Sequence, residues 1–320
     1  MKIQRRQFMK ASAAAAAGAF FSPEAFSEPD KGDSGMKIQK RKLGNTGQEL
    51  SIVGMGGIVV MNAEPAQAAK VVAESVERGI NYFDVAPTYG DAELKLGPAL
   101  KPFRKEVFLA CKTAQRSKDG AKKQLDASLE RLQTDHFDLY QLHAITDVEK
   151  DVKAAMAKDG AIQTFIEAKK QGIIKYIGFS AHSPQAALAA MAEFDFDTIL
   201  YPINFCMHFK EQFDQQVLEE AKKRNMGILA LKGMAMQKWP NPDDKKRYPK
   251  CWYEPIDDPQ LAKLAFCWTL GQGICAALPP GEEKLFRMGV EIAENFEMLT
   301  DEQVKELSQN AQHLQPILTS

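Results

Sequence analysis

The sequence NYFDVAPTYG, residues 81–90, is the most informative stretch of this chain. Its apolar start reads as a short strand that ends in a carboxylate, and a tyrosine follows in the loop. Two later strand-like runs, VFLACK at 107–112 and FDLYQLH at 137–143, end in an ammonium and an imidazole. In a barrel of alternating strands and helices, the carboxyl ends of all strands open on one face, and that face carries the chemistry. We therefore expect four side chains to meet there: Asp84, Tyr89, Lys112 and His143.

The alternation of strand-like and helix-like segments continues along the chain. The predicted strands are 51–55, 80–85, 107–112, 137–142, 174–180, 197–203, 227–231 and 274–278. The predicted helices are 65–78, 92–101, 119–133, 152–171, 184–193, 213–225, 258–271, 282–296 and 300–313. Before them, 40–50 has GNTG between two short arms and predicts a hairpin. We therefore predict an α/β protein, a (β/α)8 TIM barrel with an N-terminal β-hairpin.

An open, doubly wound sheet is the structural alternative. Such sheets usually begin with a Gly-rich G-x-G-x-x-G turn. The sequence GMGG at 54–57 does not have that spacing and reads as a tight turn after the first strand. The longest predicted loop is 233–257, and loops of this length are often functional. Its aromatic residues are suited to line a substrate mouth: Trp239, Trp252 and Tyr253.

The composition is ordinary for a soluble globular protein, with 45% hydrophobic and 26% charged residues. A formal net charge of −1 argues against a broad surface for nucleic acid or anionic membrane. The five cysteines form no C-x-x-C pair, and no zinc or iron–sulfur spacing is visible, so we expect no metal site. We expect most of these thiols to be buried as small hydrophobes, without a disulfide framework.

The N-terminus has the layout of an export signal. A basic start, 1–10, precedes an uncharged run of apolar or small residues, 11–21. That run is too short to span a bilayer as a helix, which needs about 20 residues. The pattern Arg5-Arg6-x-Phe8-Met9-Lys10 is similar to the twin-arginine signal family. The alternative is a basic, Ala-rich helix at the edge of a cytosolic domain.

The signal sets the expected domain organisation. We predict a twin-arginine signal peptide at 1–27, a flexible tether at 28–36 and the barrel at 37–318. The twin-arginine export machinery is therefore an expected partner, and we expect a periplasmic or otherwise exported protein without a stable membrane span. Nucleic acid is not an expected partner.

The four strand-end residues suit carbonyl reduction, which needs a hydride donor and a proton donor. The pKa of free tyrosine is near 10, and a nearby ammonium lowers it by favouring the phenolate. Lys112 is the candidate cation, and Asp84 can pair with it and fix its position. Tyr89 is then the general acid, and general acid catalysis contributes roughly 10²–10⁴-fold to the rate. His143 can orient the substrate carbonyl as a neutral imidazole. The alternative is that each residue has only a structural role. Asp84 and Lys112 are then an ion pair, Tyr89 is a loop aromatic and His143 is a core histidine.

The motifs around these residues resemble the aldo-keto reductase superfamily over about 37–300. They are FDVAPTYG at 83–90, CKT at 111–113, LYQLH at 139–143 and GFS at 178–180. The resemblance implies that the four residues form a catalytic tetrad. It also implies that the hydride is exchanged with NADP(H), with NAD(H) as the alternative.

The same resemblance suggests cofactor-binding positions. Ser180 ends the fifth strand, where a hydroxyl can hold a carboxamide, although Ala181 replaces the Asn often found next in the family. Asn204 follows the sixth strand and reads alternatively as a turn residue. Backbone N–H groups near Gly281 can face phosphate. The remaining positions are Gly57 and Arg287. Glu282 and Glu283 would repel a 2′-phosphate, and the charge of Arg287 would compensate for that repulsion. The alternative is that Arg287 is a solvated helix residue.

The leading interpretation is an exported reductase that acts on a small carbonyl substrate: an aldehyde, a ketone or a sugar. One alternative is a non-catalytic nucleotide-binding barrel that acts as a sensor or an auxiliary subunit. Another is a sugar or polyol dehydrogenase that works in the oxidising direction.

Overall fold

The structure, a computed structural model, describes residues 38–319. The predicted signal peptide at 1–27 and tether at 28–36 lie outside the described residues. Among the residues that are described, no helix is long and apolar enough to cross a bilayer.

Parallel strands form the central sheet of eight, in the order β12-β9-β8-β7-β6-β5-β4-β3. They are β3 (Met55–Gly56), β4 (Tyr82–Asp84), β5 (Phe108–Thr113), β6 (Phe137–Ile145), β7 (Ile174–Ala181), β8 (Thr198–Pro202), β9 (Gly227–Leu231) and β12 (Ala276–Leu278). The first and last strands are joined by a parallel bridge between Val53 and Ala277, where Ala277 N donates to Ile52 O at 2.9 Å. The sheet therefore closes, and the predicted barrel is confirmed.

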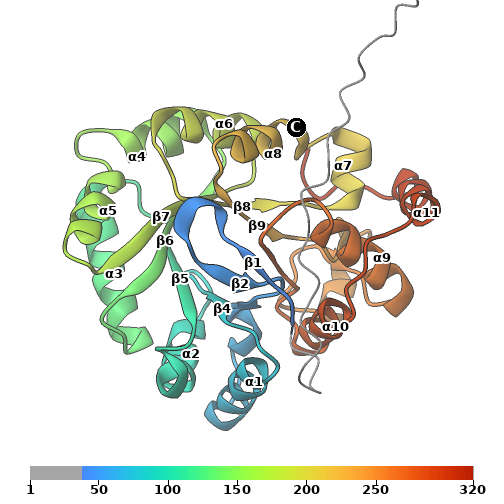
Figure 1. Cartoon of the computed structure of the whole chain (residues 1–320), viewed down its shortest axis with the longest axis horizontal. Coiled ribbons are helices and arrows are strands. Elements are labelled where there is room, and N and C mark those ends of the chain that lie inside the picture. Colours follow the sequence, from blue (N-terminus) through green and yellow to red (C-terminus); the bar gives the residue numbers. More distant parts are fainter. Residues whose placement is uncertain (1–37, 320) are drawn as a thin grey trace, which may run out of the picture. The chain divides into compact units, whose positions relative to one another are not determined.

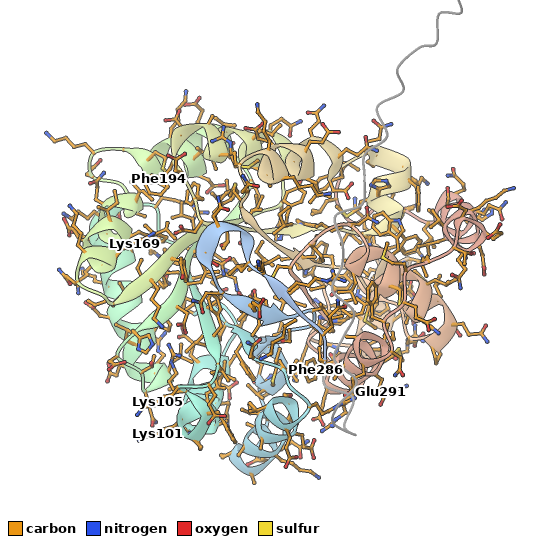
Figure 2. All side chains as sticks on the ribbon, in the orientation of Figure 1. Lys101, Lys105, Lys169, Phe194, Phe286 and Glu291 are labelled. Carbon is orange, nitrogen blue, oxygen red and sulfur yellow. The ribbon has the colours of Figure 1, made fainter. Side chains whose placement is uncertain are left out.

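Helices surround this sheet (Figure 1). They are α1 (Pro65–Glu77), α2 (Ala92–Leu100), α3 (Lys118–Leu132), α4 (Ala154–Met156), α5 (Ala161–Lys170), α6 (Pro184–Glu193), α7 (Phe205–Glu211), α8 (Gln215–Lys223), α9 (Pro259–Leu270), α10 (Glu283–Glu294) and α11 (Asp301–Gln312). Helix α11 begins with a capping box between Thr300 and Gln303, because each residue bonds the backbone of the other. Charged residues of the outer ring, including Lys101, Lys105 and Glu291, are exposed (Figure 2).

The single helix predicted for 152–171 is wrong. A π-helical turn, η4 (Val148–Lys153), leads into α4, and the chain then breaks before α5. Gly160 is the N-cap of α5, and a Cβ on it would lie 2.3 Å from Ala155 O. The backbone of Ala155 approaches so closely that only glycine fits at position 160. The hydrophobic periodicity continues through this bend and therefore does not indicate the break between the helices.

Two further segments contain elements that were not predicted. Helix α7 is a short helix of 7 residues after β8, and Asn204 caps it by accepting a hydrogen bond from Met207 N at 3.1 Å. The long loop 233–257 contains two short strands that pair antiparallel, β10 (Ala235–Gln237) and β11 (Glu254–Pro255), and a 3₁₀ helix, η5 (Pro242–Arg247). Such short segments carry little periodicity in sequence.

The predicted hairpin is present as β1 (Lys40–Lys42) and β2 (Glu49–Ser51), which pair antiparallel. It lies across the barrel in the view of Figure 1. Leu43 and Leu50 of this hairpin are buried in one cluster with side chains from the barrel strands, including Tyr82, Phe108 and Leu229. The hairpin thus covers the strand starts and leaves the opposite end, where the strands finish, for the site. The cysteines, five in all, are free and buried.

Candidate active site

The site begins with an ion pair at the ends of two neighbouring strands. Strands β4 and β5 pair in parallel with Asp84 opposite Ala110, which brings Asp84 beside Lys112. Lys112 Nζ donates to Asp84 Oδ1, and the two side chains are 0% and 1% exposed. Burying a charge costs several kcal/mol, which a close ion pair offsets. Burial lowers the pKa of Lys112, but Asp84 and Tyr89 outweigh that effect and raise it, so the ammonium stays charged.

Two buried polar residues that the sequence analysis missed also hold Asp84. Gln141 Nε2 donates to Asp84 Oδ2 at 3.0 Å, and the Tyr82 hydroxyl donates to the same oxygen at 3.3 Å. Gln141 lies opposite Lys112 in the register of β5 and β6. A glutamine is unusual inside a fully buried strand, and that mismatch is the signal that the sequence offers.

Tyr89 lies in the loop after β4, with its hydroxyl oxygen 3.4 Å from Lys112 Nζ. Burial raises the pKa of Tyr89, Lys112 lowers it, and Asp84 raises it further, with a raised pKa as the net result. The expectation that the ammonium would set a lowered pKa is therefore wrong in direction, because burial of the phenol outweighs the attraction of the cation. Tyr89 is protonated at neutral pH, which is the form that a proton donor needs.

His143 faces Tyr89 across the site, with ring centroids 5.7 Å apart in an edge-on arrangement. Its Nδ1 lies 3.4 Å from Thr88 Oγ1. Burial and the nearby charge of Lys112 lower the pKa of His143 to about 2, so the imidazole is neutral at neutral pH. Arg116, which the sequence analysis did not single out, donates to the carbonyl of His143 at 2.7 Å and pairs with Asp151 at 3.0 Å. The four residues expected at the strand ends thus lie together.

Ser180 lies beside this group at the end of β7. Its Oγ accepts a hydrogen bond from Ala144 N at 2.8 Å. Ala144 has a left-handed φ of 53°, and the β6–β7 register shifts between Leu142 and Ile145. Accepting this bond uses only a lone pair, so the Ser180 hydroxyl proton is still available for an acceptor such as a carboxamide oxygen.

The two predicted glycines are closely packed around the turn after β3. Gly57 begins the 3₁₀ turn η2 (Gly57–Val60), and a Cβ on it would lie 2.6 Å from Val85 Cγ2. A Cβ on Gly281 would lie 2.3 Å from Ile58 Cγ2. Lys250 of the long loop joins the same region, because its Nζ donates to Val59 O at 2.8 Å and its N–H donates to Glu282 at 2.7 Å.

The remaining two predicted positions are engaged elsewhere. Arg287 Nε donates to Glu283 at 2.9 Å and its Nη2 donates to Glu74 at 2.7 Å, so two carboxylates neutralise it. Asn204 is 1% exposed. Besides capping α7, its amide donates to the carbonyl oxygens of Lys232 at 3.0 Å and Ala235 at 2.7 Å. These contacts favour the structural interpretation of Asn204.

These residues fit the two ends of a nicotinamide dinucleotide unequally. The nicotinamide end fits, because the Ser180 hydroxyl has a proton to donate beside the group formed by Asp84, Tyr89, Lys112 and His143. The end that would face a 2′-phosphate fits less well, because Arg287 is bound by Glu74 and Glu283. Two basic side chains of this region take part in no ion pair among the described residues: Lys284, which is exposed, and Lys250, whose Nζ donates to Val59 O.

A separate cavity of about 330 Å³ lies at the other end of the strands. The hairpin and the strand starts line it, with Gln48, Phe108 and Lys175 among the lining residues. Its charged groups neutralise one another, since Asp138 pairs with both Arg104 and Lys175. Because none of the tetrad lines this cavity, we do not assign it to the chemistry.

Comparison with known proteins places the chain among characterised families. A model of the aldo/keto reductase family matches residues 53–255. Among curated relatives, an uncharacterised oxidoreductase of Bacillus subtilis, YqkF, is 35% identical over 161 residues, which cover 46% of this chain and 50% of the relative. L-galactose dehydrogenase of Arabidopsis thaliana is 28% identical over 217 residues, 62% of this chain and 66% of the relative. The chain thus spans between half and two thirds of the length of these two relatives.

An aldo-keto reductase of Bacillus halodurans, solved in its holo form, superposes with a TM-score of 0.66 at 23% identity and covers 88% of this chain and 98% of that one. At that identity the likeness concerns the fold. A model of the twin-arginine translocation pathway signal matches residues 2–22. The predicted signal is confirmed, and it indicates export through the twin-arginine pathway. The bounds 1–27, 28–36 and 37–318 stay predictions.

Proposed function

Because this chain belongs to the aldo/keto reductase family, we propose that it is an oxidoreductase that transfers hydride between NADP(H) and a carbonyl or alcohol substrate. NAD(H) is the alternative cofactor. The nicotinamide, when bound, supplies or accepts the hydride. The observation that carries the proposal is the 3.4 Å contact between the Tyr89 hydroxyl and Lys112, beside the imidazole of His143.

Each residue has a distinct role in this proposal. Tyr89 donates its proton to the carbonyl oxygen as the carbonyl carbon receives hydride, and the phenolate left behind is stabilised by Lys112. Asp84 holds the Lys112 ammonium in place. A Thr88 hydroxyl that donates to His143 Nδ1 leaves the ring proton on Nε2, which can donate to the substrate oxygen and orient it. In the oxidising direction the Tyr89 phenolate, stabilised by Lys112, accepts the proton of the alcohol.

Ser180 and the two glycines are the proposed cofactor contacts. The Ser180 hydroxyl is suited to a carboxamide. Gly281 lies just before the N-cap of α10, where backbone N–H groups can face a phosphate, and Gly57 begins the adjacent turn η2. Arg287 is proposed as the contact to a 2′-phosphate only after its ion pairs to carboxylates rearrange. A carbohydrate carbonyl or alcohol is the proposed substrate, which the name of the relative L-galactose dehydrogenase supports.

The export signal extends the proposal to where the protein works. The cysteines are free and buried, so the fold contains no disulfide that would have to form in an oxidising compartment. This supports folding and cofactor loading before export. The proposed site of action is the periplasm, with the twin-arginine machinery as the transport partner.

A direct test is to titrate the mature protein with NADPH and NADH by fluorescence and then to measure turnover of a generic aldehyde. We expect saturable binding of at least one nucleotide and aldehyde-dependent oxidation of it. Failure to bind either nucleotide would contradict the enzyme proposal. Binding without turnover would instead support a nucleotide-binding sensor.

A further inference from the structure

The peptide group between His143 and Ala144 is held at both of its polar atoms. Its carbonyl oxygen accepts a hydrogen bond from Arg116 Nη2 at 2.7 Å, and its N–H donates to Ser180 Oγ at 2.8 Å. Because a peptide bond is planar, these two anchors fix the orientation of the whole group. The group belongs to the backbone of His143, whose imidazole faces Tyr89. Arg116 thus contacts the proposed proton-transfer site through the backbone of one of its residues.

The backbone at this point is irregular and needs such support. Ala144 has a left-handed φ of 53°, and the register between β6 and β7 shifts between Leu142 and Ile145. A left-handed conformation is unfavourable for a residue with a Cβ and persists only where the surroundings hold it, most often at functional sites. The direction in which β6 presents His143 therefore depends on contacts made by other elements.

Arg116 is itself held by Asp151. Its Nε donates to Asp151 Oδ1 at 3.0 Å, and the two side chains are 16% and 18% exposed. The fork of the guanidinium lets one side chain reach this carboxylate and the carbonyl of His143 together. Burial raises the pKa of Asp151, but hydrogen bonds from the backbone N–H groups of Thr146 and Asp147 and the charge of Arg116 outweigh that effect and lower it. Asp151 is therefore a carboxylate at neutral pH.

The other carboxylate oxygen of Asp151 binds the turn that follows β6. Its Oδ2 accepts hydrogen bonds from Thr146 N at 2.8 Å, Thr146 Oγ1 at 3.1 Å and Asp147 N at 3.0 Å. Asp151 lies in the π-helical turn η4, and such turns are rare and often occur at functional sites. Arg116 comes from the loop between β5 and α3. The pair therefore ties this loop to the segment that directly follows His143.

We propose that Arg116 is a positioning residue for His143, and that the Arg116–Asp151 pair sets the orientation of the imidazole at the reacting carbonyl. This inference rests on the proposed reductase function. Arg116 acts through the backbone carbonyl of His143 and has no contact with the substrate in this proposal. Loss of the guanidinium frees the carbonyl side of the peptide group. The imidazole then loses its fixed direction, whereas Tyr89 keeps its contact with Lys112.

The test is a double-mutant cycle on the reduction of 4-nitrobenzaldehyde by NADPH. Arg116→Met keeps an unbranched side chain but loses the guanidinium. We expect kcat/KM to fall roughly 10- to 100-fold, because a misplacement of about 1 Å at a reacting centre can cost that much. In the His143→Gln background, the same substitution should lower kcat/KM by less than about two-fold, because the residue that Arg116 positions is already lost. Effects that multiply would show that Arg116 acts independently of His143 and would overturn the proposal.

Two further variants separate positioning from a general loss of structure. Lys118→Met removes an exposed ion pair to Glu167, two residues after Arg116, and should leave kcat/KM unchanged. Asp151→Asn removes the charge that holds the guanidinium and should lower kcat/KM in the same direction as Arg116→Met. In both Arg116→Met and Asp151→Asn, the affinity for NADPH should stay within about two-fold of wild type. A loss of nucleotide affinity as large as the loss of kcat/KM would assign the pair a general structural role and overturn the proposal.

A second arm observes the imidazole without turnover. The ring-nitrogen NMR signals of His143, identified by their absence in His143→Gln, report which tautomer the ring adopts. We expect Arg116→Met to redistribute these signals between the two tautomers or to broaden them, and Lys118→Met to leave them unchanged. If the wild-type protein neither binds NADPH nor reduces the aldehyde, the reductase proposal fails, and this arm still decides whether Arg116 positions His143. Identical His143 signals in wild type and Arg116→Met overturn the positioning role.

Discussion

The Lys112 ammonium lies 3.4 Å from the Tyr89 hydroxyl oxygen while it is paired with the Asp84 carboxylate. The carboxylate is fixed in turn by Gln141 and Tyr82. Because burial raises the pKa of Tyr89 and Lys112 opposes that rise, the phenol is protonated before the reaction. The same cation is in place to stabilise the phenolate afterwards.

Replacing Lys112 with methionine should affect both turnover and stability. Without the ammonium, the phenolate of Tyr89 loses its stabilisation, and we expect kcat to fall by roughly 10²-fold or more. The buried Asp84 also loses its counterion, which should cost about 3–5 kcal/mol of unfolding free energy. Urea denaturation measures the second effect. The double variant Asp84→Asn/Lys112→Met should recover much of the stability but none of the activity; a double variant as unstable as the single one would contradict this explanation.

The neutrality of His143 predicts a pH dependence of stability. Its pKa is lowered from 6.5 to about 2 in the folded protein, chiefly by burial. The unfolded chain therefore binds a proton below about pH 6.5 that the folded chain does not, and stability falls as the pH falls. We expect wild type to lose more stability than His143→Gln between pH 7.5 and pH 5 in chemical denaturation. Parallel losses in the two proteins would mean that His143 is charged when folded.

The ion pairs of Arg287 predict weak discrimination between the nucleotides. Glu283 and Glu74 neutralise the guanidinium that would otherwise attract a 2′-phosphate. Glu283→Gln should therefore improve the affinity for NADPH several-fold relative to NADH, by an amount typical of one partly exposed charge pair. Fluorescence titration with both nucleotides gives the ratio. Glu291→Gln, at an exposed glutamate of the same helix, is the control. No change in the ratio would place Arg287 away from the nucleotide.

The sequence predicts the barrel well because short apolar strands and amphipathic helices alternate regularly. It also predicts that Asp84, Lys112 and His143 meet, because strand ends converge in this fold. It fails where a residue's role depends on partners that are distant in sequence. The role of Gln141 depends on its hydrogen bond to Asp84, which is distant in sequence and lies beside it only in the folded protein. The direction of the pKa shift of Tyr89 likewise depends on how deeply the folded chain buries the phenol.

The same limit applies around the nucleotide contacts and the loops. Asn204 suits a cofactor contact by its position after a strand, yet its amide is bound to the backbone of α7 and of the loop after β9. Gly160 marks the break in a predicted helix, where a Cβ would clash with the backbone of Ala154 and Ala155.

The most direct test of the central claim is the Tyr89→Phe variant, which removes a single hydroxyl from the site. We predict that aldehyde reduction falls by roughly 10²–10⁴-fold, the usual contribution of a general acid. The affinity for NADPH, measured by fluorescence on the same preparation, should stay within about two-fold of wild type, since a hydroxyl is not expected to anchor the dinucleotide. Reduction at a near wild-type rate, or a large loss of nucleotide affinity, would contradict the assignment of Tyr89 as the proton donor.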